Sequence, residues 1–105
     1  MLDLTRETLA LMERYGDGKK PLWITEIGCG AGTKESDLEQ ARLLAEVYAA
    51  ARKEARIQRV FWFVLRDLEK DVLGPEGSMG LFNFQGKPKP ALEAFRRAVE
   101  KGSSK

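Results

Sequence analysis

The sequence contains no histidine and a single cysteine, Cys29. Without histidine, a Ser-His-Asp or Cys-His triad cannot form within the chain, and the commonest zinc ligand is missing. One cysteine cannot form an internal disulfide, so nothing in the sequence calls for an oxidising compartment. Because no neighbouring residue marks Cys29 as a nucleophile, we expect it to be a small loop or core residue. The sequence predicts no metal and no cofactor.

A large excess of one charge sign and long apolar runs are also missing. The 18 basic and 16 acidic residues are interspersed and give a formal charge of +2. The sequence therefore lacks the clustered positive charge that is typical of nucleic-acid-binding proteins. No apolar run approaches the roughly 18 residues that a membrane span needs, and the N-terminus does not resemble a signal peptide. We therefore expect no nucleic-acid or membrane partner and a cytoplasmic location.

Three segments have the apolar spacing of helices, in a chain of 105 residues that is long enough for one small domain. The first places Leu4, Thr8, Leu11 and Tyr15 on one face; Asp3 or Thr5 can cap its start, and Gly16 can end it. The second opens on Ser36-Asp-Leu-Glu39, which has the spacing of a capping box, and runs to about Arg56 with Leu44 and Tyr48 on its apolar stripe. The third begins at Pro90 and ends at Gly102.

Two short apolar segments lie between these helices, at Pro21–Ile27 and Val60–Leu65. Neither alternates apolar and polar residues, which is typical of strands covered on both faces in a parallel sheet. The expected fold class is therefore α/β, in the order α-β-α-β-α with two parallel strands joined by a right-handed crossover. Residues 66–80, including Gly74 and Pro75, are expected to form a loop.

Glu26 falls at the C-terminal end of the first strand, the end at which barrel enzymes build their active sites. Counting alternate residues back from Glu26 places Leu22 and Ile24 on the interior face, and Trp23, Thr25 and Ile27 toward the helices. In the second strand, counting alternate residues from Trp62 places Val60 and Val64 on the interior face with it. A tryptophan near a carboxylate suits a sugar site, although core packing also explains Trp62.

Several motifs in one order carry a resemblance to a known family. The segment Lys20-Pro-Leu-Trp-Ile-Thr-Glu-Ile-Gly28 resembles the seventh strand of retaining glycoside hydrolases of the large (β/α)8-barrel clan. Gln40-Ala41, the run from Arg59 to Asp67, Met79-Gly-Leu81 and Lys87-Pro-Lys-Pro-Ala-Leu92 are similar to the segments that follow it. By this resemblance residues 1–102 are a C-terminal fragment of a (β/α)8 barrel, from helix 6 through helix 8, with residues 103–105 a disordered tail.

The resemblance also implies roles for four residues. Glu26 would be the catalytic nucleophile, Trp62 the strand-eight aromatic under the sugar, and Asp67 and Arg66 substrate-binding residues near the mouth of the site. The substrate would be a carbohydrate. Retaining hydrolysis needs a second carboxylate as acid/base, and the family's Asn-Glu motif for it is not in this chain, whose only asparagine is Asn83. We therefore expect the chain to be inactive alone.

Two other interpretations stay open at this point. Glu26-Ile-Gly-Cys-Gly-Ala-Gly32 also matches the glycine-rich loop of Rossmann-like methyltransferases that bind S-adenosylmethionine. That fold needs a second strand ending in an acid about 20 residues further on, where the helical segment lies instead. Alternatively, the chain is a non-catalytic structural or sugar-binding remnant.

The two strands also predict self-association. Both are apolar on both faces, yet a sheet of two strands leaves two edges without partners. We expect the chain to pair its strands with another copy of itself, as a dimer or a higher oligomer.

Overall fold

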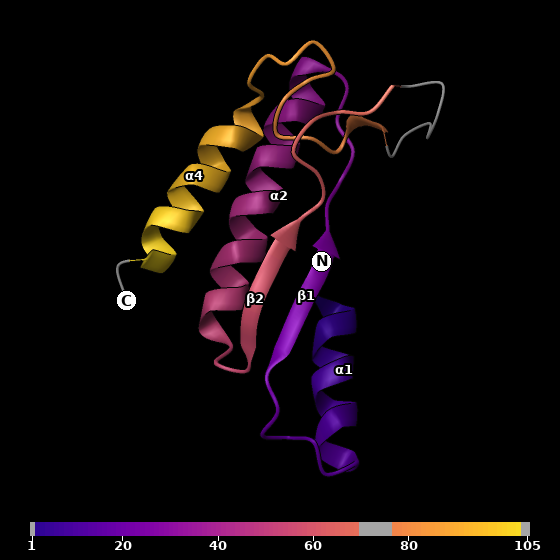
Figure 1. The fold of residues 1–105 in the computed structure, drawn as a ribbon, viewed down its shortest axis with the longest axis vertical. Helices are drawn as coiled ribbons and strands as arrows, with labels where there is room; N and C mark the ends of the chain where they lie inside the picture. Colours follow the sequence, from indigo (N-terminus) through magenta and orange to yellow (C-terminus); the bar gives the residue numbers. More distant parts are fainter. Residues whose placement is uncertain (1, 70–76, 104–105) are drawn as a thin grey trace.

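The computed structural model describes residues 2–69 and 77–103, and its elements follow the predicted order (Figure 1). The elements are α1 (Asp3–Arg14), β1 (Leu22–Ile27), α2 (Lys34–Lys53), β2 (Ile57–Trp62) and α4 (Pro90–Ser103). The two strands pair in parallel, and α2 connects them. The α/β class and the two parallel strands are thus confirmed. Residues 70–76 of the predicted loop, with Gly74 and Pro75, and residues 104–105 of the predicted tail lie outside the described residues.

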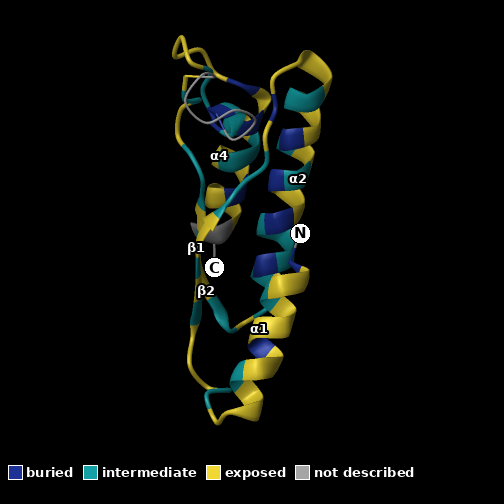
Figure 2. Cartoon of the chain, turned by 90° about the vertical axis from the view of Figure 1, so that its right-hand side faces the viewer, coloured by how far each residue is buried: buried dark blue, intermediate teal, exposed yellow. Residues whose placement is uncertain are grey.

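The helices cover only one face of the strands, as the side view in Figure 2 shows. Between sheet and helices lies a core of Leu44, Leu81 and Ala91, with the half-buried Trp62 and Phe95 packed against it. The molecule is consequently thin, with extents of 46 × 32 × 19 Å. Its radius of gyration of 15.0 Å exceeds the roughly 13 Å typical of a compact domain of this length.

The direction in which strand residues point corrects the sequence-based assignment. Trp23 of β1 and Phe61 of β2 lie on the uncovered face, 53% and 48% exposed, with ring centroids 6.3 Å apart. Ile24 is half-buried, and Trp62 packs on the helix-covered core. The prediction that Leu22, Ile24, Val60 and Trp62 point away from the helices, and Trp23 toward them, is therefore wrong. The pairing register shifts between Ile24 and Ile27, so an alternation counted back from Glu26 does not continue along the strand.

Helix α1 ends as predicted but presents a different face to the core. Gly16 takes a φ of 84°, and the amides of Gly16 and Asp17 donate to the carbonyls of Glu13 and Met12, which is the Schellman arrangement. The N-cap is Leu2, without a side-chain hydrogen bond, so the prediction of a cap at Asp3 or Thr5 is wrong. The predicted apolar face is also wrong as a core face, because Leu2 and Leu9 are buried whereas all four of its members are exposed: Leu4, Thr8, Leu11 and Tyr15.

Helix α2 begins earlier than the predicted capping box. Thr33 is the N-cap, its hydroxyl accepts from the Ser36 amide at 3.1 Å, and Ser36 Oγ accepts from the Thr33 amide at 2.9 Å. Ser36 is thus the third helical residue and not the cap, and Glu39 pairs with Arg42 instead. The helix ends at Lys53, before the expected Arg56.

The boundaries of α4 and β2 agree with the prediction only in part. Pro90 is the first residue of α4, as predicted, and Ala91 and Ala98 are buried along that helix. Helix α4 continues past Gly102 to Ser103. Strand β2 begins at Ile57 and ends at Trp62, three residues before both predicted boundaries.

Candidate functional site

Glu26 lies near the C-terminal end of β1, in a cavity of about 260 Å³. Ile27, Gly28, Phe63 and Met79 line the cavity with it, and Glu26 is the only ionisable residue among them. Its side chain is exposed, and no ion pair within the described part of the chain involves it. The Glu26 carboxylate therefore faces an open space, with the Phe63 ring and the Met79 thioether beside it, and none of these ion pairs ties it to the rest of the structure.

Three segments converge on this cavity through their backbones. The Phe63 amide donates to the Ile27 carbonyl at 2.8 Å, which places the residue after β2 beside the end of β1. A Cβ on Gly28 would lie 2.3 Å from the Phe63 carbonyl oxygen, so only glycine fits there. The Val64 amide, which belongs to a cis Phe63–Val64 peptide, donates to the Met79 carbonyl at 3.3 Å. The aromatic and the methionine are thus held next to Glu26 by main-chain contacts.

Trp62 is not among the residues that line the Glu26 cavity. It packs on the core of Leu44, Leu81 and Ala91, and its Nε1 donates to the Met79 carbonyl at 3.1 Å. Phe63 is the aromatic beside Glu26, and sequence reasoning missed it because the family resemblance assigned that place to Trp62. Strand periodicity alone carries no signal for Phe63, since β2 has already ended at Trp62.

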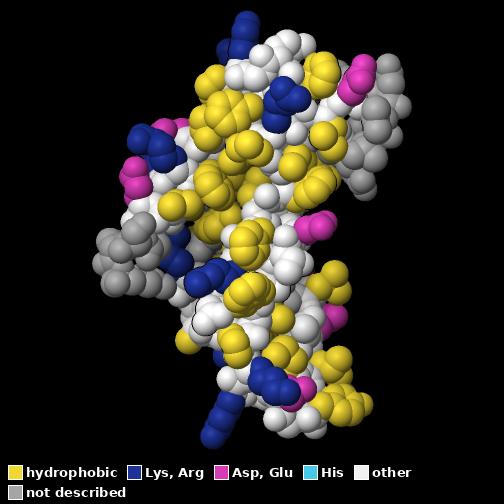
Figure 3. Space-filling view, in the orientation of Figure 1, with side chains coloured by type: hydrophobic (Ala, Val, Ile, Leu, Met, Phe, Trp, Pro, Cys, Tyr) yellow, Lys and Arg dark blue, Asp and Glu magenta, His cyan; other side chains and the backbone are white. Residues whose placement is uncertain are grey.

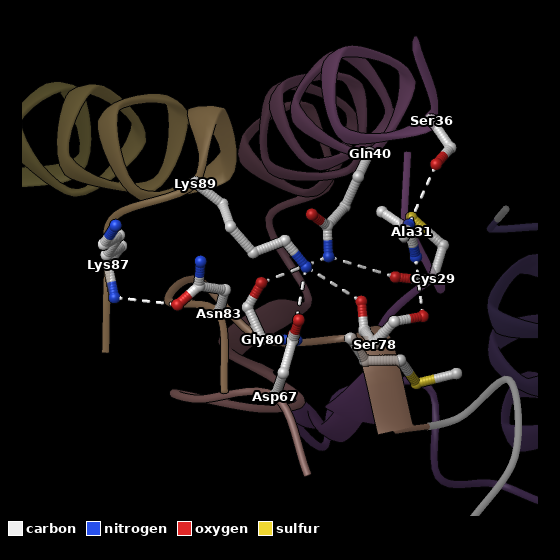
Figure 4. A network of polar contacts seen from close by, with 12 residues as sticks. Cys29, Ala31, Ser36, Gln40, Asp67, Ser78, Gly80, Asn83, Lys87 and Lys89 are labelled. Carbon is white, nitrogen blue, oxygen red and sulfur yellow. Dashed lines mark hydrogen bonds and ion pairs between the residues drawn. The ribbon is translucent and has the colours of Figure 1, made fainter. Parts of the chain in front are cut away.

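Asp67 and Arg66, the other two predicted site residues, do not line the Glu26 cavity either. Asp67 Oδ1 accepts from the Gly80 amide at 2.7 Å and from Lys89 Nζ at 3.0 Å (Figure 4). Lys89, only 6% exposed, also donates to the Ser78 carbonyl at 2.9 Å. The guanidinium of Arg66 lies 5.8 Å from the centre of the Phe84 ring. Asp67 therefore has a structural role, because its ion pair with Lys89 connects the segment after β2 to the start of α4.

A second cavity of about 530 Å³ lies beside this buried ion pair. It is lined by Asp67 and Lys89 together with Gly32 of the β1–α2 loop, Asp37 of the first turn of α2, and Asn83 of the segment before α4. Glu26 does not line it, so the predicted nucleophile and the predicted Asp67 contact line different cavities.

Gln40 is a buried polar residue for which sequence reasoning assigned no role. It is 1% exposed, and its Nε2 donates to the carbonyls of Cys29 at 3.2 Å and Gly80 at 3.3 Å (Figure 4). The side chain thereby joins the loop after β1 to the segment after β2. Cys29 is a half-buried loop residue; burial raises the pKa of its thiol, Glu39 adds to that rise, and Lys89 opposes it. A thiol held in its neutral form is a poor nucleophile.

Neither a metal centre nor a membrane span is found in the described ranges. Within residues 2–69 and 77–103, no three metal-ligating side chains of the Cys, Asp and Glu type gather closely enough to hold an ion. No helix in those ranges combines the length and the apolar character that crossing a bilayer requires.

Comparisons with known proteins place this geometry in context. A family model described as "Glycosyl hydrolase catalytic core" matches residues 3–95. A search of curated proteins found no match. Among solved structures, the chain resembles a GH2 beta-galacturonidase from Eisenbergiella tayi, with a TM-score of 0.78 and 22% identity over 94% of this chain and 20% of that one.

Two further solved structures agree with it. A GH5_18 protein from Bifidobacterium longum subsp. longum gives a TM-score of 0.73 and 23% identity over 92% of this chain and 25% of that one. Xylanase 10B from Thermotoga petrophila gives a TM-score of 0.66 and 19% identity over 90% of this chain and 31% of that one. These likenesses establish the fold, which is that of part of a (β/α)8 barrel. The chain spans between a fifth and a third of the lengths of these proteins.

Proposed function

Because the chain belongs to the family described as the glycosyl hydrolase catalytic core, we propose that it carries the nucleophile of a retaining glycosidase, and that this nucleophile is Glu26. One observation carries the proposal: an exposed carboxylate at the C-terminal end of a parallel strand, alone in a cavity beside an aromatic ring. In (β/α)8 barrels this end of the strands holds the catalytic residues.

The reaction assigns a simple role to Glu26. In retaining hydrolysis a carboxylate attacks the anomeric carbon and forms a glycosyl-enzyme, while a second carboxyl group about 5–5.5 Å away protonates the leaving oxygen. Glu26 is the only carboxylate that lines its cavity, so the described residues supply the nucleophile without its acid/base partner. The chain alone would therefore not turn over an ordinary glycoside.

The substrate class that fits is a carbohydrate, with Phe63 as the ring beneath it. A flat apolar ring packs well on the C–H face of a pyranose. Phe63 lines the Glu26 cavity, whereas Trp62 is engaged in the core, so we transfer the sugar-stacking role from Trp62 to Phe63. Asp67 and Arg66 are not retained as substrate contacts, because their partners are Gly80, Lys89 and Phe84.

The nucleophile can be tested without an acid/base residue. The departure of 2,4-dinitrophenolate needs no protonation, so a nucleophile alone can react with a 2,4-dinitrophenyl glycoside. A panel of such glycosides is incubated with the chain, and released phenolate and intact protein mass are measured. We expect stoichiometric release without steady-state turnover, and one glycosyl adduct that peptide mapping places on Glu26.

Glu26→Gln is the test variant and Glu35→Gln, at an exposed position on α2, is its matched control. Loss of the adduct in the first variant alone supports the assignment. An adduct or turnover that survives Glu26→Gln overturns it. No adduct with any sugar would favour the other function class, a sugar-binding or structural role without catalysis.

The methyltransferase alternative has no support in these comparisons. Residues 34–53 form one continuous helix, and the next strand ends at Trp62, so the acid-tipped second strand of a Rossmann-like unit does not follow at the required distance. The family model and the three solved structures reported above describe glycoside hydrolases instead.

A further inference from the structure

Helix α1 carries a second apolar face that its own chain does not cover. Leu2 and Leu9 point into the molecule, whereas Leu4, Leu11 and Tyr15 are 77%, 50% and 73% exposed. Helical spacing places these three residues along one side of α1. We call them, together with Glu7, the α1 ridge. Figure 3 shows hydrophobic side chains over the outer side of this helix.

At the other edge of the sheet lies a groove that matches the ridge in character. This groove, of about 330 Å³, is formed by the C-terminal part of α2, by β2 and by α4, and we call it the β2 groove. Its apolar lining includes Ile57, Val60 and Ala98. In Figure 1 α1 lies beyond β1, while α4 lies beyond β2, so the ridge and the groove are at the two lateral edges of the same two-stranded sheet.

The charges of ridge and groove are complementary. The β2 groove is lined by Arg52 and Arg59, and its one acid, Glu54, accepts a hydrogen bond from the Arg56 amide. Arg52 Nη1 is buried but has no hydrogen-bond partner. A buried unsatisfied guanidinium nitrogen is costly, and a carboxylate is its natural partner.

Glu7 is the acid that the ridge offers. It lies between Leu4 and Leu11 on the same side of α1, its side chain is exposed, and no ion pair among the described residues involves it. An apolar ridge with one acid thus corresponds to an apolar groove with an unpaired arginine nitrogen.

From this match we propose that copies of the chain associate head to tail, with the α1 ridge of one copy in the β2 groove of the next and Glu7 paired with Arg52 across the contact. The arrangement places the free edge of β1 in one copy beside the free edge of β2 in the next. Parallel strands can then continue from copy to copy, which removes the unpaired edges inside the assembly. Such a contact is heterologous, so it builds a ring or an open chain of copies.

Charge reversal tests the contact. Glu7→Arg places two cations together at the contact, and Arg52→Glu places two carboxylates there, so each variant alone should associate at least tenfold more weakly than the parent chain. Mixing the two variants at equal concentration restores opposite charges at every contact. Sedimentation velocity at micromolar concentration should show the parent above its monomer mass of 11.8 kDa, each variant near that mass, and the mixture again above it.

Glu35→Arg is the matched control, because it reverses an exposed acid on α2 outside ridge and groove. It should associate like the parent. A parent chain that stays monomeric at tens of micromolar overturns the proposal, as do reversals that leave the mass unchanged or folded variants that do not recover on mixing. Circular dichroism reports folding; if a reversal unfolds the chain, Glu7→Gln and Arg52→Gln replace the pair, and each must then weaken association.

Discussion

Gly28 sets how closely the two strand ends approach each other beside Glu26. A Cβ at this position would lie 2.3 Å from the Phe63 carbonyl oxygen, a backbone atom that cannot rotate away. The Phe63 amide is simultaneously bonded to the Ile27 carbonyl at 2.8 Å, so relief would require the strand ends to separate. The cavity at Glu26 therefore depends on a residue without a side chain.

Gly28→Ala should destabilise the chain by about 1–3 kcal/mol, the usual cost of forcing an atom into a packed site. Gly32→Ala is the matched control, because a Cβ there meets no atom within 4 Å. Urea unfolding monitored by circular dichroism measures both. Equal stability of the two variants would mean that β1 and the residue after β2 do not approach as closely as the structure has them.

At the level of single residues, sequence reasoning located the acid but not its surroundings. Glu26 was found at the end of β1 because a run of strand-forming residues precedes it and glycines follow it. Phe63, Gln40 and the Asp67–Lys89 pair were missed as structural partners, since their contacts join positions 11 to 40 residues apart. Contacts of that kind depend on how loops fold over each other, which no local pattern encodes.

Among the elements, α4 is anchored to the segment after β2 by the buried Lys89–Asp67 pair. The side chains of Lys89 and Asp67 are 4% and 15% exposed, and both make further bonds to backbone groups of Gly80 and Ser78. Removing one member of a buried pair leaves the other charge without a partner, whereas replacing both by apolar residues is far less costly.

Lys89→Met or Asp67→Leu alone should therefore cost about 3–5 kcal/mol, and the double variant clearly less than either. The exposed Arg96–Glu93 pair on α4 is the comparison, and removing it should leave unfolding nearly unchanged. A double-mutant cycle in urea gives the coupling. Additive effects of the two substitutions would show that the pair does not act as a unit.

The order of the elements could be predicted, while their ends and faces were predicted less well. Apolar spacing and Gly16, Pro90 and the strand-like runs indicated three helices and two strands in the observed order. The cap of α2 was misplaced by three residues because Thr33 and Ser36 form the reciprocal bonds that Ser36 and Glu39 were expected to make. The face of α1 was wrong because this helix is apolar on two sides, and periodicity cannot tell which side its own chain covers.

As a whole, the molecule has one covered and one uncovered side. Helices α2 and α4 bury Leu44, Leu81 and Ala91, whereas no described helix covers the other face of the strands (Figure 2). On that face Trp23 and Phe61 are about half exposed, and the Arg59 guanidinium lies 5.9 Å from the centre of the Trp23 ring. The uncovered side shows hydrophobic side chains along the strands in Figure 3. Within a complete (β/α)8 barrel, the face of the strands opposite the helices is the packed interior. The sequence thus carries residues for an interior that this chain alone does not enclose.

This two-sided structure predicts unequal costs for similar truncations. Leu44 is fully buried between α2 and α4, so Leu44→Ala should cost about 2–5 kcal/mol through lost contacts and a cavity. Phe61 is half exposed in the single chain, and its ring loses mainly a contact with Trp23, so Phe61→Ala should cost about 1 kcal/mol or less at concentrations where the chain is monomeric. Urea unfolding at two protein concentrations measures both.

If association covers the strand face, the cost of Phe61→Ala should rise with concentration while that of Leu44→Ala stays constant, since only the first site gains contacts from another copy. A Phe61→Ala cost as large as that of Leu44→Ala even at high dilution would mean that this face is already packed within the monomer.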